Sequence, residues 1–157
     1  MPTAAQLEAT IRTYFDGCNE ADIDKMTACM EADAAHYFPA GAPQGPFLGA
    51  RSIAEGWVRA VQALGSIWTI DRVLVDAARL EAVIEWTHFK PKLGTYLRGD
   101  EWYVFSPAGK IKEIRAYYAC PPPPVSEAPR SHELGGVDYH GRGYPHVPPA
   151  VRRKGEQ

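Results

Sequence analysis

The sequence predicts an α+β domain in which the helices come first and an antiparallel sheet follows. Two observations carry this prediction: apolar residues recur at helical spacing up to about residue 64, and from Ser66 onward they alternate with polar residues. A third observation is a rise in proline content at Cys120, beyond which lie more than half of the chain's 14 prolines. We therefore expect one domain at residues 1–119 and a Pro-rich C-terminal extension at 120–157, of which residues 120–148 lie extended over the body or a partner subunit.

Three helices are predicted before residue 65. Residues 3–19 carry a single apolar stripe, with Thr3 available as N-cap. Asp22 can cap a second, shorter helix that continues to about residue 30. A third helix is expected over 52–64, where Ser52 and Glu55 have the spacing of a capping box.

The predicted sheet follows a loop. Residues 35–38 read as a short strand, and PAGAPQGPFLG at 39–49 reads as loop because it holds three prolines and three glycines in eleven residues. Alternating patterns then predict strands at about 66–76, 79–90, 95–106 and 110–119. Short turns join these four strands, which predicts an antiparallel meander.

Composition excludes several classes of protein. The net charge is −2 without a basic stripe, so nucleic acid is not an expected partner. No apolar run approaches the ~20 residues of a membrane span, and the N-terminus lacks the pattern of a secretory signal. The three cysteines form no close pair, which is typical of reduced thiols in a cytoplasmic protein. Histidine spacing predicts no metal site, and the absence of Gly-rich nucleotide motifs predicts no cofactor.

The order of elements resembles the cone-shaped NTF2-like fold, and in particular its SnoaL-like branch of polyketide cyclases, ketosteroid isomerases, scytalone dehydratase and limonene epoxide hydrolase. The stretches that carry the resemblance are TYFDGCNEADIDKM, GARSIAEGWVRA and RGDEWYVFSPAGKIKEIRAYYA, within about residues 5–119. The resemblance implies three helices packed on a curved antiparallel sheet, and a pocket between them. It also implies a homodimer through the outer face of the sheet.

Strand parity selects the residues that face this pocket. On strand 79–90, Trp86 and His88 share the more apolar face, and on strand 95–106 Glu101 shares such a face with Tyr103. Asp100 then points outward. If the turn is centred between Gly94 and Thr95, His88 lies opposite Glu101. A turn centred on Lys92-Leu93 moves Glu101 two residue pairs away, and in either register we expect a hydrogen bond between His88 and Glu101 to be within reach.

A histidine beside a carboxylate in an apolar pocket is suited to general acid–base catalysis. We expect His88 to act as the base and Glu101 as its partner or as a second acid. The resemblance to the cyclases and dehydratases implies a third catalytic residue, Tyr14, as proton donor to a substrate oxygen. Parity leaves open which of His36 and Tyr37 faces the pocket. The expected substrate-binding residues are Trp86, Tyr103, Tyr37, His36, Trp57 and Tyr118.

The last strand narrows the chemistry. Ile114, Ala116 and Tyr118 are expected inside, and Arg115 outside near Glu85 or Glu113. Limonene epoxide hydrolase, which this stretch resembles, has an aspartate where Ala116 stands, so its mechanism is not expected here. The hypothesis is a cofactor-independent dehydratase, isomerase or cyclase acting on a small apolar or aromatic carbonyl or hydroxyl compound. The alternative is a non-catalytic binding or dimerisation module of the same fold.

Overall fold

The computed structural model describes residues 1–42, 45–119 and 131–156, without the side chains of Ser131 and His132. Its helices are α1 (Ala4–Glu20), α2 (Ile23–Ala28), α3 (Ala50–Leu64) and the short 3₁₀ helix η1 (Pro91–Leu93). Its strands are β1 (Met30–Tyr37), β2 (Phe47–Leu48), β3 (Ile67–Asp76), β4 (Glu81–Lys90), β5 (Thr95–Phe105), β6 (Ile111–Tyr118) and β7 (Ser131–His132).

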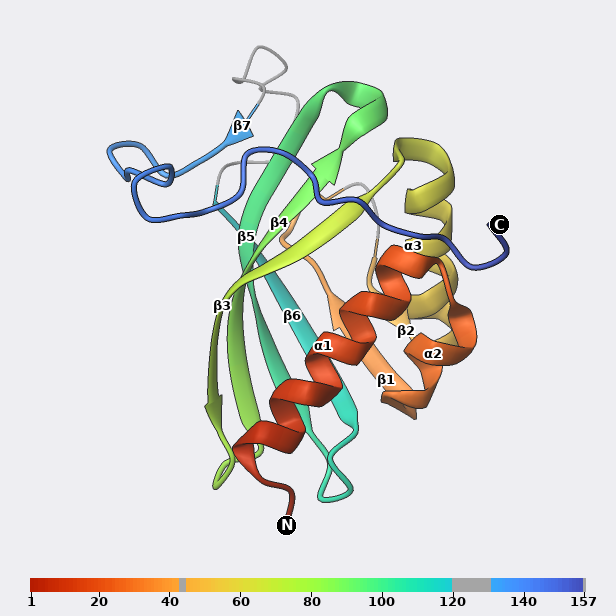
Figure 1. The fold of residues 1–157 in the computed structure, drawn as a ribbon. Coiled ribbons are helices and arrows are strands. Elements are labelled where there is room, and N and C mark those ends of the chain that lie inside the picture. The colour runs from red at the N-terminus through yellow and green to blue at the C-terminus, as the bar shows by residue number, and fades with distance from the viewer. Residues whose placement is uncertain (43–44, 120–130, 157) are drawn as a thin grey trace.

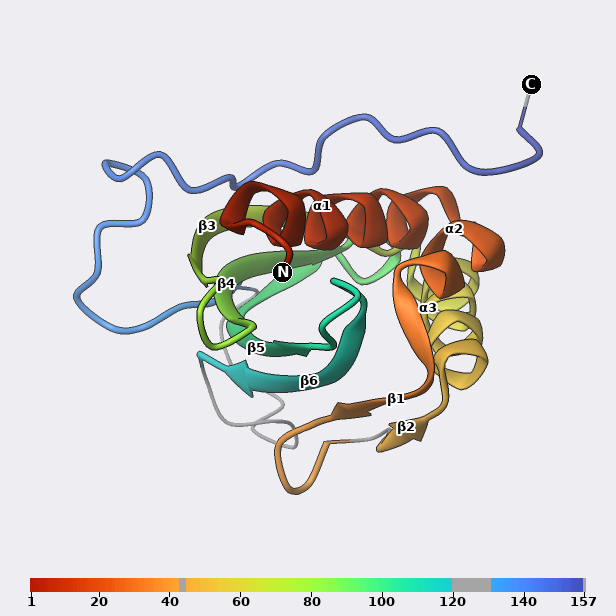
Figure 2. The same ribbon diagram turned by 90° about the horizontal axis from the view of Figure 1, so that it is seen from below.

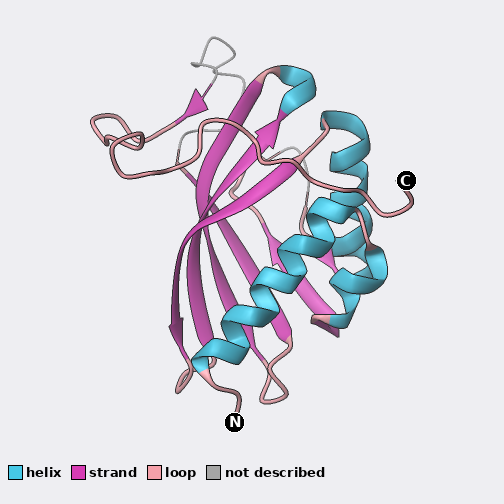
Figure 3. Cartoon of the chain, in the orientation of Figure 1, coloured by secondary structure: helices cyan, strands magenta, loops and turns pink. Residues whose placement is uncertain are grey.

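One curved sheet, with the strand order β2-β1-β6-β5-β4-β3, wraps around the helices. Figure 2 shows α1 and α3 on the concave side of this sheet, so that strands and helices together enclose a cone. Figure 3 shows the same division into one layer of strands and one layer of helices. The α+β cone expected from the sequence is confirmed by this architecture.

The predicted helices form, with one correction at a cap. Thr3 caps α1, and its capping box is completed by Gln6, while Asp22 caps α2 by accepting from the backbone of Lys25. The capping box expected at Ser52 is wrong, because α3 starts earlier, at Ala50, after Gly49 with a φ of 96°. Glu55 therefore bonds to Arg51 on the helix surface instead of to a cap.

The apolar stripe on α1 is buried as predicted. Its members Leu7, Ile11, Tyr14, Phe15 and Cys18 all lie in the core, where α1 packs across β3. Cys18 and Cys29 are buried free thiols, and Cys120 lies outside the described residues. In the described part of the chain, no helix combines the length and the apolar character needed to cross a bilayer.

The meander β3-β4-β5-β6 forms as predicted, but the sheet is larger than the sequence indicated. Strand β1 begins at Met30 rather than at residue 35 and pairs with β6 in parallel. Phe47 and Leu48, expected in a loop, form β2 against β1. These pairings depend on segments far apart in the chain, which the alternation within a single segment does not reveal.

The hairpin between β4 and β5 has the second of the two registers considered above. The helix η1 and Gly94, which has a φ of 63°, make the turn, and Lys90 therefore pairs with Thr95. His88 lies opposite Leu97, and Glu101 lies opposite Ile84. The offset in this register is larger than the two residue pairs expected: four residues separate His88 from Glu101 along the strands, roughly 13 Å at ~3.3 Å per residue.

The described part of the C-terminal extension returns to the body of the domain. Strand β7 pairs in parallel with the start of β5, beyond the end of β6. The chain then passes over the outer face of the sheet and ends beside α1, where the backbone N–H of Lys154 donates to the carbonyl of Glu20 (Figure 1). The expectation for residues 120–130 falls outside the described residues.

Candidate functional site

The interior of the cone holds a small cavity between the sheet and α3, with a volume of about 30 Å³. Aromatic rings make most of its wall. The side chains that line it are Phe38, Trp57, Trp68, Trp86, His88, Leu97, Glu101, Ala116 and Tyr118. A second, smaller cavity of about 10 Å³ shares three of these residues and is lined by Tyr14, Phe15, Cys18, Trp57, Trp68 and Glu101.

Glu101 is the carboxyl group of this cavity. It is 7% exposed, and the hydroxyl of Tyr103 donates to its Oε2 at 2.5 Å. Burial raises the pKa of Glu101 from 4.5 to about 7, and the hydrogen bond from Tyr103 opposes part of this rise. At neutral pH the side chain is therefore present in both its protonated and its ionised form, as a group that transfers protons requires.

His36, rather than His88, is the histidine beside this carboxyl. Its Nε2 lies 3.5 Å from Glu101 Oε1, and neither ring nitrogen has a hydrogen-bond partner among the described residues. The ring is fully buried and stacks on Phe38 with centroids 4.4 Å apart. Burial lowers the pKa of His36 to about 3, so the imidazole is neutral at pH 7.

His88 faces the cavity as predicted, but the hydrogen bond expected between it and Glu101 is wrong. Its Nε2 is bonded to Ser66 Oγ at 2.7 Å, and its ring stacks on Trp68 at 4.6 Å. The turn at η1 causes the difference, because it sets the register that separates His88 from Glu101. Burial, helped by the charge of Lys90, holds the pKa of His88 well below its ordinary value.

Tyr14 lines the second cavity, and the indole Nε1 of Trp57 donates to its hydroxyl at 2.6 Å. Burial raises the pKa of Tyr14 well above 10, with smaller contributions from Cys18 and Glu101. The phenol is therefore neutral at physiological pH and keeps a proton that it can donate. The sequence placed this residue on the buried stripe of α1, and the structure brings it to the same cavity as Glu101.

The expected substrate-binding residues divide into three groups. Trp57, Trp86 and Tyr118 line the cavity, and burial raises the pKa of Tyr118 to about 12. Tyr103 and His36 are fully buried in contact with Glu101. Tyr37 is 42% exposed and is not part of the cavity wall, which resolves the alternative between His36 and Tyr37 in favour of His36.

Sequence reasoning missed Phe38, Trp68 and Ser66. Trp68 faces the interior because it pairs with His88, a relation that the parity of β4 and the turn at residues 77–80 could have indicated. Ser66 lies in the two-residue link between α3 and β3. Phe38 belongs to the segment after β1, and its contact with His36 depends on a stacking geometry that the sequence does not specify.

The last strand faces as predicted. Ile114 and Ala116 are buried, and Ala116 lies directly opposite Glu101, so β6 places no second carboxylate there. Arg115 points outward and is paired with Glu113. Among the described residues, no cluster of three or more His, Cys, Asp or Glu side chains has the arrangement of a metal site.

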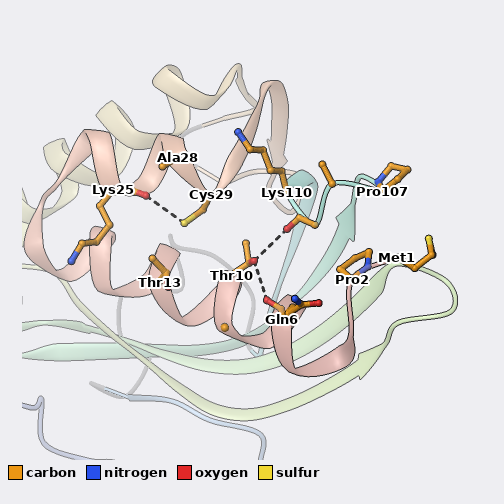
Figure 4. A pocket seen from close by; sticks show the side chains of 13 residues that line it. Met1, Pro2, Gln6, Thr10, Thr13, Lys25, Ala28, Cys29, Pro107 and Lys110 are labelled. Carbon is orange, nitrogen blue, oxygen red and sulfur yellow. Dashed lines mark hydrogen bonds between the residues drawn. The ribbon is translucent and has the colours of Figure 1, made fainter.

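A larger hollow, of about 740 Å³, lies at the surface between α1, α2 and the β5–β6 turn (Figure 4). It is an open groove, and several of its polar groups are already engaged. Lys25 is paired with Glu20, and the thiol of Cys29 donates to the backbone of Lys25. We therefore place the candidate site in the smaller interior cavity, which contains the carboxyl with the raised pKa.

Comparison with known proteins places the chain in a family. The sequence profile of the SnoaL-like domain matches residues 11–114. A crystal structure of a protein of unknown function with a cystatin-like fold, from Methylobium petroleophilum PM1, is 52% identical. The match covers 94% of this chain and 96% of that one, with a TM-score of 0.75. Among curated proteins, none matches the chain.

Two more distant structures show the same fold. A candidate ketosteroid isomerase from Kribbella flavida is 17% identical over 96% of each chain, with a TM-score of 0.61. A candidate polyketide cyclase from Sinorhizobium meliloti is also 17% identical, over 74% of this chain and 100% of that one, with a TM-score of 0.60. Because the profile spans most of the cone that surrounds Glu101, the chain belongs to the SnoaL-like domain family.

Proposed function

We propose that this protein is a cofactor-independent enzyme of the lyase or isomerase type, in which Glu101 transfers a proton to or from a small carbonyl or hydroxyl compound. One observation carries the proposal: a buried carboxyl, without a lysine or arginine partner among the described residues, lines an aromatic cavity with its pKa raised to about 7. Such a group is costly to bury and is common where acid–base chemistry is performed.

In this proposal the ionised Glu101 removes a proton from the carbon next to a substrate carbonyl, and the protonated form returns it. In the proposal Tyr14, which lines the second cavity together with Glu101, donates to an oxygen on which negative charge develops. His36 remains neutral beside the carboxyl, because burial lowers its pKa to about 3. Glu101 is a better base than His88, since the pKa of His88 is pushed well below neutrality and its Nε2 is bonded to Ser66.

A second candidate function is a binding module without catalysis. One observation favours it: both His88 and Glu101 already have hydrogen-bond partners. For either function the cavity of about 30 Å³ is far smaller than the ~300–1,000 Å³ of ordinary ligand sites. A substrate can enter only if the wall moves. Phe38 and Tyr118 are the partly exposed aromatic residues of that wall.

Exchange of carbon-bound hydrogen for deuterium in D₂O, followed by NMR, tests the proposal without knowledge of the natural substrate. A panel of small enolisable ketones and β-hydroxy ketones is incubated with the wild type, with Glu101→Gln and with His88→Gln. We expect exchange by the wild type, a loss of about 10²–10⁴-fold in Glu101→Gln, and a much smaller loss in His88→Gln.

The rate of exchange should rise with pH around the raised pKa of Glu101, near 7. Equal exchange by wild type and Glu101→Gln would contradict the assignment of the base. Ligands that bind to both proteins without any exchange would instead support the binding module.

A further inference from the structure

The indole N–H of Trp86 has no hydrogen-bond partner among the described residues, although the side chain is only 5% exposed. Buried donors are nearly always bonded in native proteins, and an unbonded one costs roughly 1–3 kcal/mol. Trp57 provides the contrast within the same wall, because its indole N–H donates to Tyr14. Because Trp86 lines the cavity, a ligand bound there can supply the missing acceptor.

The position of the Trp86 ring is fixed by its neighbours. A Cβ added to Gly99, which lies opposite Trp86 in the β4–β5 ladder, would come within 2.6 Å of the indole ring. Glycine at this position therefore lets the ring lie across β5. The ring also meets Tyr118 edge-on, with centroids 6.0 Å apart.

Trp86 and Glu101 line the same cavity from adjacent strands. Glu101 pairs with Ile84, and Trp86 is the next residue of β4 on the same face, so the two are diagonal neighbours. Diagonal positions are about 7–8 Å apart at the backbone, within reach of long side chains. A substrate carbonyl oxygen bonded to the indole can thus present its neighbouring C–H bond to the carboxyl.

The charge of the cavity limits which oxygen compounds can bind. Its described wall contains no lysine or arginine. Arg98, on the same strand as Glu101, points to the opposite face of the sheet and is bonded there to Glu133. A carboxylate or phosphate ligand would bring a second negative charge next to Glu101 in an apolar site without a cation, which is strongly unfavourable.

We propose that Trp86 is a specificity-determining residue, whose indole N–H binds the oxygen of an uncharged, planar carbonyl compound, and that the cavity rejects the corresponding anions. The inference rests on the proposed function, because it places the substrate of Glu101. It adds which side chain holds the oxygen and which charge the ligand carries.

Calorimetric binding of three matched probes tests the inference: 1-indanone, the hydrocarbon indane, and indane-1-carboxylate. We expect the wild type to bind the ketone about tenfold more tightly than indane, which corresponds to one hydrogen bond to a previously unbonded donor, and to bind the carboxylate more weakly than indane. In Trp86→Phe the preference for ketone over indane should fall to within about twofold, while indane binds as before.

A second measurement uses the wild type alone, so it does not depend on whether Trp86→Phe folds. In the ¹H–¹⁵N spectrum of the wild type, the indole signal of Trp86 should move downfield with 1-indanone and not with indane. An unmoved signal, a ketone preference that survives Trp86→Phe, tighter binding of the carboxylate, or absence of ketone binding would each overturn the inference.

The fate of the proposed function is read separately. Glu101→Gln should still bind 1-indanone with the ketone preference intact, while it no longer exchanges deuterium into the ketone. Ketone binding through Trp86 in a wild type that performs no exchange would refute the proposed function and leave the assignment of Trp86 standing.

Discussion

Two charged residues of β5, Arg98 and Glu101, are both buried, yet the structure treats them in opposite ways. Arg98, 2% exposed on the outer face, donates to Thr87 Oγ1, to Glu133 and to the carbonyl of Pro145. Glu101, 7% exposed on the inner face, has one hydrogen bond from Tyr103 and a neutral histidine nearby. The charge of Arg98 is compensated by several hydrogen bonds, as a buried structural residue requires. The carboxyl of Glu101 is buried with a raised pKa, which is typical of groups that perform acid–base chemistry.

The environment of Arg98 explains how the C-terminal extension is held. The guanidinium lies over the rings of Tyr96, Tyr139 and Tyr144 at 4.9, 4.7 and 5.6 Å from their centroids. Two of these tyrosines, with Glu133 and Pro145, belong to the extension. The extension thus supplies most of the groups that compensate for the burial of this arginine.

The largest expected effect on stability comes from removing Arg98, which breaks its contacts on the outer face of the sheet (the outer cluster). Arg98→Met should lower the free energy of unfolding by about 4 kcal/mol, because it leaves Asp71 buried without its cation, which lies 4.0 Å away. Urea denaturation measures this loss, and limited proteolysis should show earlier cleavage of the C-terminal extension. Glu133→Gln, which keeps the cation and one acceptor, is the control and should cost about 1–2 kcal/mol. A loss below about 1 kcal/mol in Arg98→Met would remove the structural role.

The carboxyl of Glu101 should have the opposite effect on stability: it should lower the free energy of unfolding as the pH rises. Its pKa is about 7 in the folded state against 4.5 ordinarily, so the folded protein binds its proton more tightly than the unfolded chain. Relative to Glu101→Gln, the wild type should therefore lose stability between about pH 4.5 and 7 and lose no more above that range. At ~1.4 kcal/mol per pKa unit the total is about 3 kcal/mol. Denaturation of both proteins from pH 4 to 8 measures it, and a difference independent of pH would contradict the raised pKa.

We propose that the protein forms the homodimer that the resemblance implies, through the part of the outer face that the contacts of Arg98 leave uncovered. Leu74, Val83 and Trp102 form a continuous row across β3, β4 and β5, and Leu74 and Trp102 are 71% and 37% exposed. Trp102→Asp should weaken self-association by about 2 kcal/mol or more, as for a central interface tryptophan. Analytical ultracentrifugation measures the dimer constant. Lys112→Asp, an exposed change of charge on β6, is the control, and an unaltered constant in Trp102→Asp would exclude this face.

The smallest expected effect is a change in the pKa of Glu101 that leaves this carboxyl in place. Tyr103→Phe deletes the hydrogen bond that opposes the rise in the pKa of Glu101, so that pKa should move further above 7. The pH at which deuterium exchange reaches half its maximum should increase by at least about one unit, since hydrogen bonds to charged groups are worth ~1.5–3 kcal/mol. His88→Gln, which does not contact Glu101, should leave this pH unchanged. An unshifted profile in Tyr103→Phe would mean that another group limits exchange.

The sequence predicted the inner face of the sheet, around Glu101, better than the outer face, around Arg98. Parity placed His88, Glu101 and Tyr103 inside and Asp100 outside, because a strand alternates its side chains without regard to its neighbours. It could not assign Arg98 to a buried cluster, since the partners of Arg98 come from an extension whose path is not encoded by any local period. The pairing of His88 with Glu101 failed for a related reason: the turn at Pro91–Gly94 decides the register, and several turns fit that sequence.

By itself, the sequence determined the α+β class, the buried stripe of α1, the four-strand meander and the inward direction of Glu101, because each follows from periodicities within one segment. The tertiary structure alone decided that His36 lies beside Glu101, that the Trp86 ring lies against Gly99 with its N–H unpartnered among the described residues, and that the C-terminal extension closes over Arg98. These three features arise where segments distant in the sequence meet. They depend on strand register and side-chain packing, which patterns within a single segment do not specify.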